Sequence, residues 1–224
     1  MRYSVRKEPL VNDEFYHIFS KSIAGFRIFN DESEFLRMIK VIRYYQIEKP
    51  KIKFSDFIKL KKTGQREINH YDLSSEKEKL VEIVAYCLMP THIHLILQQI
   101  KTDGISAFMN KILNSYTRFF NIKHKRKGPL WETRFKSVLI KTNEQMLHLT
   151  RYIHLNPVAT YLVDKPEEWF YSSYREYILE VSPDERLCNF YNLLEITPST
   201  YRAFVEDRIA FQRELERIKD LLLE

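Results

Sequence analysis

The sequence predicts an α+β protein built on an antiparallel sheet of the ferredoxin-like, split βαβ type. Two observations lead to this prediction. Segments with strand and helix periodicity follow one another in the order strand, helix, strand, strand, helix, strand, and a further helix comes next. The chain has 224 residues, 44% of them hydrophobic, so it can bury one core of about 150 residues with appendages. We expect helices on one face of the sheet and a helical C-terminal extension.

The first half of the chain supplies one strand and one helix. A strand is predicted at residues 15–22 and is closed by Gly25. A helix follows, since Asn30 or Asp31 can cap it and Glu34 lies at the capping-box position. Its buried stripe is predicted to be Phe35, Met38, Ile39 and Ile42. Residues 48–78 interrupt the pattern with a short amphipathic piece and a polar run, and we interpret them as an insertion.

The second half supplies the remaining elements. Strands are predicted at 80–89 and 92–98, with Pro90 and Thr91 in the turn. A long helix runs from Gly104 to about 125, with a buried stripe at Ile105, Phe108, Met109, Ile112, Tyr116, Phe119 and Phe120. The fourth strand is predicted at 135–142.

A helix is expected at 143–156, capped by the Asn143 side chain, with Met146, Leu149 and Ile153 pointing inward. Pro157 disfavours helical backbone at Asn156, which places the predicted end there. We assign residues 1–178 to the main domain, with the insertion at about 48–78, and residues 179–224 to an acidic extension. Within the extension, residues 184–224 are predicted to be helical.

The net charge of +6 is unevenly distributed. Residues 1–164 carry 28 Lys and Arg against 17 Asp and Glu, whereas residues 165–224 carry 8 against 13. A basic, aromatic-rich domain favours a polyanionic partner, nucleic acid rather than a membrane. The alternative is ordinary solvated surface charge.

Other sequence features narrow the class of protein. No run approaches the roughly 18 uninterrupted apolar residues of a membrane span, and the first twelve residues lack the apolar core of a signal peptide. We therefore expect a cytoplasmic protein. Cys87 and Cys188 are too few and too far apart for a disulfide scaffold, so we interpret both as small buried hydrophobic residues.

Two histidines on one strand form the first candidate site. His92 and His94 are two residues apart, so they project from the same face, while Ile93 and Leu95 face the other way. Two neutral imidazoles on one face can hold a metal cation. A pair of sheet histidines bonded to backbone or water is the alternative.

The predicted helix at 143–156 offers the second candidate site. Gln145, His148, Tyr152 and Asn156 form one row along it, beside the apolar stripe. If this row faces the two histidines, Tyr152 is a candidate nucleophile and Asn156 an oxygen ligand. His154 lies on the opposite side of the helix and is interpreted as structural. Tyr116 is the rival nucleophile, although its place in an apolar stripe favours a core position.

A basic segment between the long helix and the fourth strand is the candidate phosphate-binding surface. Its cations surround a Gly-Pro turn and one tryptophan. Residues that could contact DNA are Lys123, Lys125, Arg126, Lys127, Arg134 and Lys136. Trp131 either stacks on an unpaired base or packs in the core.

Four ordered motifs within about residues 12–178 resemble the REP-associated tyrosine transposases, a branch of the single-tyrosine HUH transposases of bacterial insertion sequences. They lie at Tyr86–Leu95, Gly128–Lys136, Tyr152–Val158 and Trp169–Tyr174. The resemblance implies a metal-dependent nuclease and strand transferase for single-stranded DNA that carries a hairpin.

The resemblance also implies roles for individual residues. Tyr152 would form a 5′-phosphotyrosine, and His92, His94 and Asn156 would hold Mg²⁺ or Mn²⁺. The metal, a bound water or His148 would assist the tyrosine. The family includes dimers and monomers, so the resemblance implies a monomer or a homodimer, nucleoid-associated when bound to DNA. Two other hypotheses stay open: a non-catalytic relative that binds DNA hairpins, and a zinc hydrolase that uses His92, His94 and His148.

Overall fold

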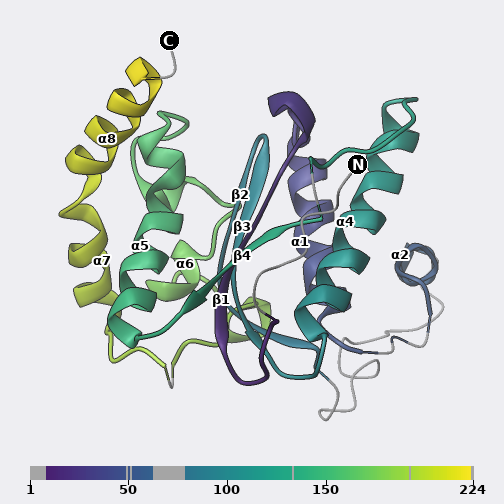
Figure 1. Ribbon diagram of the computed structural model, residues 1–224, viewed down its shortest axis with the longest axis horizontal. Coiled ribbons are helices and arrows are strands. Elements are labelled where there is room, and N and C mark those ends of the chain that lie inside the picture. Colours follow the sequence, from purple (N-terminus) through teal and green to yellow (C-terminus); the bar gives the residue numbers. More distant parts are fainter. Residues whose placement is uncertain are drawn as a thin grey trace.

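The computed structural model describes residues 9–48, 50, 52–62, 79–132, 134–191 and 193–222. Its centre is a four-stranded antiparallel sheet in the order β2-β3-β1-β4 (Figure 1). The strands are β1 (Phe15–Lys21), β2 (Val81–Met89), β3 (His92–Gln99) and β4 (Lys136–Ile140). This order confirms the predicted split βαβ plan, in which the first and third strands lie at the centre.

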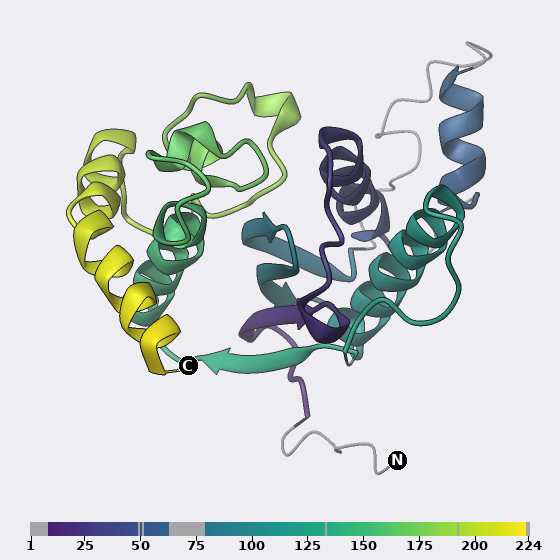
Figure 2. The ribbon, with the colours of Figure 1, turned by 90° about the horizontal axis from the view of Figure 1, so that it is seen from above.

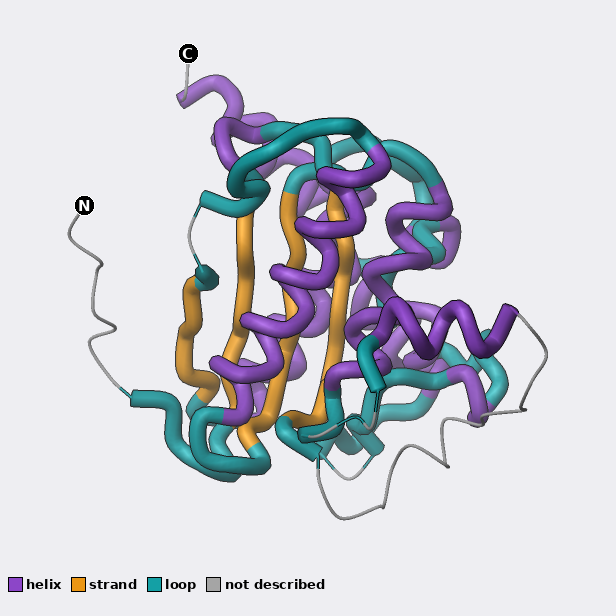
Figure 3. The backbone as a smooth tube through the Cα atoms, turned by 90° about the vertical axis from the view of Figure 1, so that its right-hand side faces the viewer, coloured by secondary structure: helices purple, strands orange, loops and turns teal. Residues whose placement is uncertain are grey.

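Helices cover both faces of the sheet (Figures 1 and 2). The crossover helices α1 (Glu32–Tyr45) and α4 (Gly104–Lys123) pack together on one face, which Figure 3 turns toward the viewer. The opposite face holds α5 (Asn143–Ala159), and α7 (Pro198–Glu206) and α8 (Ile209–Leu222) pack behind it. The expectation of helices on one face of the sheet thus holds for α1 and α4. The helix α5 forms a second layer on the opposite face.

Short elements complete the described structure. The insertion contains α2 (Phe54–Lys62), while residues 63–78 lie outside the described residues. The remaining elements are η1 (Ile23–Gly25), η2 (Pro166–Glu168), α6 (Tyr174–Tyr177) and η3 (Pro183–Glu185). None of the helices in the described ranges is both long enough and apolar enough to cross a membrane.

The N-terminal cap agrees with the prediction in α1 and differs from it in α5. Asp31 caps α1, because its side chain accepts a hydrogen bond from the Glu34 backbone N–H at 3.1 Å. The prediction that Asn143 caps α5 was wrong. Thr142 is the cap, since its hydroxyl accepts from the Gln145 N–H at 3.1 Å.

The end of α5 also differs from the prediction. The helix continues through Pro157 to Ala159. The backbone after the proline closes the last turn, because Thr160 N donates to Asn156 O at 3.1 Å and Leu162 N donates to Pro157 O at 2.9 Å. Asn156 therefore keeps its helical position, one turn beyond Tyr152.

The prediction of helix throughout residues 184–224 was wrong for 186–191 and 193–197. Isolated turns occur here, such as Leu194 N donating to Phe190 O at 3.1 Å, and other backbone groups bond to neighbouring elements. Leu187 N and Cys188 N donate to the buried Glu176 carboxylate at 2.9 and 2.8 Å, and Asn189 N donates to Ile83 O of β2 at 2.8 Å. Cys87 and Cys188 are free and buried, as predicted. The domain boundary at residue 178 stays a prediction.

Candidate active site

Three imidazoles meet on the α5 face of the sheet. His92 and His94 project from β3, and their ring centroids are 5.0 Å apart. His17 of the neighbouring strand β1 lies beside them, with its ring centroid 5.1 Å from that of His94. Ile93 and Leu95 point to the other face and are fully buried. The predicted pair therefore shares one face, and a third histidine joins it.

The hydrogen bonds of the pair leave the same ring nitrogen available on each residue. His94 Nδ1 is hydrogen-bonded to His17 Nε2 at 2.9 Å, and His92 Nδ1 is hydrogen-bonded to Thr91 Oγ1 at 2.9 Å. Among the described residues, none of the hydrogen bonds uses Nε2 of His92 or His94. Both rings are thus held at Nδ1, and both Nε2 atoms can face a ligand.

Burial keeps these histidines neutral at pH 7. It lowers the pKa of His17 to about 4. The pKa of His92 is lowered to about 4 by burial and by the nearby Lys21 charge, against a small opposing effect of Glu216. The pKa of His94 is well below its ordinary value because of burial, its two histidine neighbours and Lys21. Neutral imidazoles keep the lone pairs that a metal needs.

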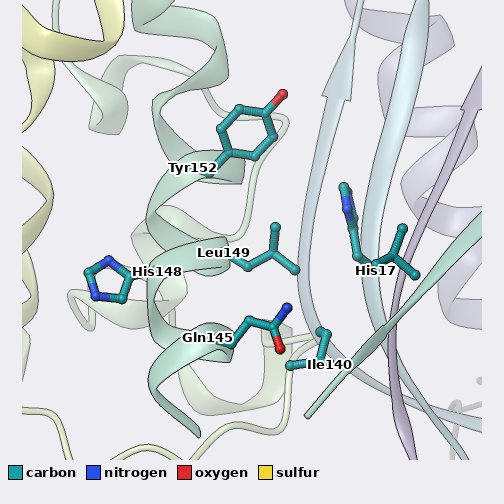
Figure 4. A pocket seen from close by; sticks show the side chains of 7 residues that line it. His17, Ile140, Gln145, His148, Leu149 and Tyr152 are labelled. Atoms are coloured by element: carbon teal, nitrogen blue, oxygen red, sulfur yellow. The ribbon is translucent and has the colours of Figure 1, made fainter. Parts of the chain in front are cut away.

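Tyr152 faces this cluster from α5. Its ring centroid lies 6.0 Å from that of His94, with the two planes nearly perpendicular at 88°. Figure 4 shows the Tyr152 ring extending from the helix on the side of His17, in line with Leu149 and Gln145 below it. The predicted row therefore faces the sheet at Gln145 and Tyr152.

His148 leaves the row. Figure 4 shows its ring on the other side of α5, turned away from Tyr152. Its Nδ1 is hydrogen-bonded to Arg151 Nη2 at 2.8 Å, and its ring lies edge-on to Phe204 at 5.5 Å. Within the described residues, His148 does not join His92 and His94 in a metal cluster, as a zinc site requires. His148 and Tyr152 line the same hollow, so the assistance of His148 to Tyr152 stays a prediction.

Asn156 carries an unsatisfied buried atom. The residue is 8% exposed, and its side-chain Nδ2 is buried without a hydrogen-bond partner. An amide in such a place can turn its Oδ1 to the same position, where a cation would satisfy it. Within the described ranges, no three His, Cys, Asp or Glu side chains converge as a metal cluster, so an amide oxygen is the third protein ligand available. Two neutral imidazoles and one amide are side chains that can serve as ligands to a divalent cation.

Three other residues are structural. His154 is fully buried, with Nδ1 bonded to Tyr201 Oη at 2.6 Å and Nε2 bonded to Ser173 Oγ at 2.7 Å, which confirms its predicted role. Tyr116 is fully buried, and its hydroxyl donates to Ile28 O. Trp131 is 9% exposed and donates from Nε1 to Thr117 Oγ1 at 3.1 Å, so its position favours packing over base stacking.

The cations of the basic segment divide into two groups. Lys123 pairs with Asp31 at 2.6 Å and with the buried Glu34 at 2.9 Å, and Arg126 donates to Asn121 Oδ1 at 2.9 Å and Pro129 O at 3.0 Å. These two fix the loop to the protein. The exposed members of the second group are Lys125, Lys127, Arg134 and Lys136.

Lys136 of the second group lies near the end of the sheet that carries His92. The β1 residue Lys21 pairs in register with His92, and the next residue, Ser22, bridges to Trp131 of the segment. Lys136 Nζ lies 5.9 Å from the ring centroid of Phe19, whose ring is 6.0 Å from that of His94. A phosphate bound by Lys21 or Lys136 would be close to the histidine pair.

His17 and Lys21 are the site residues that sequence reasoning missed. Both lie in the strand that was predicted correctly, and they share one face of it. Only the pairing of β1 with β3 brings them to His94 and His92. The sequence signal was that the two residues are separated by an even number of positions and so share one face of the strand. This signal does not locate a site until the neighbouring strand is known.

Fold and site together define a class: ferredoxin-like α+β proteins in which two histidines on a central strand face a helix-borne tyrosine. Comparisons with known proteins agree. Residues 49–156 match the family model described as "Transposase IS200 like". A REP-associated tyrosine transposase of Haemophilus influenzae is 30% identical over 115 residues, which is 46% of this chain and 65% of that protein. Its counterpart in Escherichia coli is 24% identical over 113 residues, or 50% and 66% of the two chains.

A solved structure shows the same fold. It is that of the REP-associated tyrosine transposase bound to a REP hairpin, with a TM-score of 0.52 and 17% identity over 87% of this chain and 99% of the other. Each sequence match spans just under two thirds of the relative's length. These findings confirm that the chain is similar to the REP-associated tyrosine transposases, as the four sequence motifs indicated.

Proposed function

We propose that this protein is a metal-dependent endonuclease and strand transferase for single-stranded DNA, with Tyr152 as its nucleophile. The placement of Tyr152 6.0 Å from His94 supports this most directly. The similarity to transposases, one of them solved with a hairpin bound, supports hairpin-containing DNA as the partner.

His92, His94 and Asn156 would hold the cation, Mg²⁺ or Mn²⁺. In the tautomer that this requires, His94 Nδ1–H donates to His17 and His92 Nδ1–H donates to Thr91, so that each Nε2 keeps its lone pair. The bound cation would polarise the scissile phosphate and offset charge in the transition state. The orphaned Asn156 amide is the observation that supports the third ligand.

The proposed reaction is a transesterification. The Tyr152 oxygen attacks phosphorus as its proton leaves, the bond from phosphorus to the 3′ oxygen breaks, and that oxygen takes up a proton. The products are a 5′-phosphotyrosine and a free 3′-hydroxyl. A second 3′-hydroxyl can reverse the step and release the tyrosine without ATP, because the phosphodiester energy is kept in the covalent link.

The exposed cations would bind the DNA backbone next to the site. Lys125, Lys127, Arg134 and Lys136 are proposed to contact phosphates. Lys21 is added to this set, since its charge acts on both histidines of the pair.

One chain would suffice for the reaction. Tyr152 lies over the sheet of its own chain, with its ring centroid 6.0 Å from that of His94. We therefore propose an active monomer. Mixing the inactive variants Tyr152→Phe and His92→Ala checks this: a monomer gives no adduct in the mixture, whereas restored adduct would indicate a dimer that exchanges the tyrosine helix.

The direct test of the proposed function is covalent trapping. A labelled single-stranded oligonucleotide with a hairpin, incubated with Mg²⁺ or Mn²⁺, should give a protein–DNA adduct that Tyr152→Phe abolishes. Tyr161→Phe is the matched control, since Tyr161 is exposed on the turn after α5. An adduct lost in Tyr116→Phe and kept in Tyr152→Phe would overturn the assignment. Salt-sensitive hairpin binding without cleavage under any metal would favour a non-catalytic hairpin binder.

A further inference from the structure

A small hollow adjoins the nucleophile. It has a volume of about 290 Å³ and lies between the first turns of α5 and the strands β1 and β4 (Figure 4). It is lined by His17, Val138, Ile140, Gln145, His148, Leu149 and Tyr152. Two of these, His17 and Tyr152, belong to the candidate active site. The hollow is therefore continuous with the place where the scissile phosphate would lie.

The size and lining of the hollow suit one planar ring. Its volume is at the small end of ligand pockets, which span about 300 to 1,000 Å³. Val138 and Ile140 from β4 and Leu149 from α5 give it apolar walls. Val138 is 51% exposed, which leaves an apolar side chain open to a ligand. Apolar walls with polar groups at the rim are what a nucleobase requires, because its faces are apolar and its edges form hydrogen bonds.

The amide orientation of Gln145 is fixed by the start of the helix. The Lys141 backbone N–H donates to Gln145 Oε1 at 2.9 Å, and the Gln145 N–H donates to Thr142 at 3.1 Å. Only the amide oxygen can accept from an N–H, so the other atom must be the NH₂ group. Figure 4 shows this nitrogen on the side of Leu149 and the oxygen turned away. Among the described residues, no hydrogen bond uses Nε2 of Gln145. The two N–H groups of this amide can therefore donate to a ligand in the hollow.

We propose that this hollow binds one unpaired base next to the scissile phosphate, and that Gln145 selects a base with a carbonyl oxygen at C6 or C4, as in guanine and thymine, over one with an amino group there. The proposal rests on the proposed function, since it needs the DNA strand to pass Tyr152. Gln145 would then be a specificity-determining residue, and His17 would form part of the wall of the hollow.

The test compares bases at the two positions that flank the cleaved bond. Hairpin oligonucleotides with each of the four bases at each position are assayed for adduct formation. Wild-type protein should prefer guanine and thymine, which carry O6 or O4, over adenine and cytosine, which carry an amino group there, by roughly three- to tenfold at one position, the range of a single hydrogen bond. Gln145→Ala should remove the preference. Gln145→Glu should shift it toward bases with an exocyclic amino group, because the carboxylate still accepts from Lys141 and replaces the donor with an acceptor.

Glu144→Gln is the matched control, since Glu144 is an exposed neighbour in the same helix turn. It should keep the wild-type preference. Glutamate is a favoured residue three positions after a threonine cap, so Gln145→Glu should keep the start of α5. A wild-type preference that survives both Gln145 substitutions would overturn the proposal.

A second measurement separates this proposal from the proposed function. Oligonucleotides with 2-aminopurine at each flanking position are bound to the Tyr152→Phe protein, which needs no cleavage. Fluorescence should change at one position, and Val138→Asp should remove the change. If wild-type protein forms no adduct but this signal is present, the nuclease fails and the base site stands. If adduct forms but neither position responds, the base site fails and the nuclease stands.

Discussion

The site face of the sheet and the packed core behind α5 both contain a buried, neutral histidine, and the two histidines differ in their hydrogen bonds. His154 is bonded at both ring nitrogens, to Tyr201 and Ser173. His94 is bonded at one, to His17. Burial lowers the pKa of both residues. Burial and a lowered pKa therefore do not distinguish the two histidines, whereas the number of bonded ring nitrogens does.

The cations of the basic segment also differ in whether partners inside the protein satisfy them. Lys123 is paired with Asp31 and Glu34. Burial alone would raise the pKa of Glu34. Hydrogen bonds from Asn30, Lys123 and His124 outweigh this effect, so the pKa of Glu34 is lowered. Lys127 is exposed, and no ion pair within the described ranges includes it. A residue whose bonding capacity is satisfied inside the protein supports the fold, and one with capacity left can bind a ligand.

The largest expected effect is on activity. His94→Ala should abolish the metal-dependent DNA adduct while the thermal midpoint changes by only a few degrees, because His94 bonds one neighbour and faces the site. Adduct gels and thermal unfolding of the same preparation check this. Full activity in the variant would mean that the open nitrogen has no function.

The opposite pattern is expected for His154→Ala. The substitution leaves a cavity and two buried polar groups without partners, at Tyr201 and Ser173, so we expect a loss of about 3 to 4 kcal/mol in the free energy of unfolding. Urea unfolding at pH 7 measures it. Adduct formation per folded molecule should be nearly unchanged, and a loss below 1 kcal/mol would refute the structural role.

Acid should destabilise the protein through His154. Burial lowers its pKa from 6.5 to about 3, so the unfolded chain takes up a proton before the folded one as the pH falls. The stability is therefore complete above about pH 6.5 and is lost progressively toward pH 3. Between pH 7 and pH 5 the loss attributable to His154 is about 2 kcal/mol. Urea titrations of wild type and His154→Gln at both pH values test this, and equal slopes would contradict it.

A smaller effect is expected at the residue that orients His94. His17→Leu removes the hydrogen bond to His94 Nδ1 and should weaken Mn²⁺ binding by about 10- to 100-fold, the range for groups that orient a metal ligand. Calorimetry with Mn²⁺ alone measures it. His17→Gln should recover part of the affinity because an amide oxygen can accept from His94 Nδ1–H, and equal affinities in both variants would argue against orientation.

The smallest effect concerns the cations. Lys127→Ala should weaken hairpin binding a few-fold and reduce the slope of log affinity against log salt by about 0.7 to 0.9, the value of one phosphate contact. Lys123→Ala should instead lower the thermal midpoint. Salt titrations by fluorescence anisotropy distinguish them, and an unchanged slope in Lys127→Ala would remove Lys127 from the DNA-binding set.

The sequence predicted much of the fold and part of the site. Strand positions, the shared face of His92 and His94, the facing of Tyr152 and the structural role of His154 all follow from periodicity, which depends only on the nearest residues along the chain. Helix ends were predicted less well: Thr142 competed with Asn143 as the cap, and hydrogen bonds beyond Pro157 closed a turn that the proline alone disfavours.

The remaining features depend on contacts between distant segments. The sequence alone determined which residues are strand, helix and candidate ligand, because local backbone geometry fixes the direction of each side chain. The tertiary structure decided that His17 holds His94, that Trp131 is buried and that Asn189 bonds to β2. The physical reason is that each of these outcomes depends on which partner satisfies a hydrogen-bonding group, and the partner is 14 to 106 residues away.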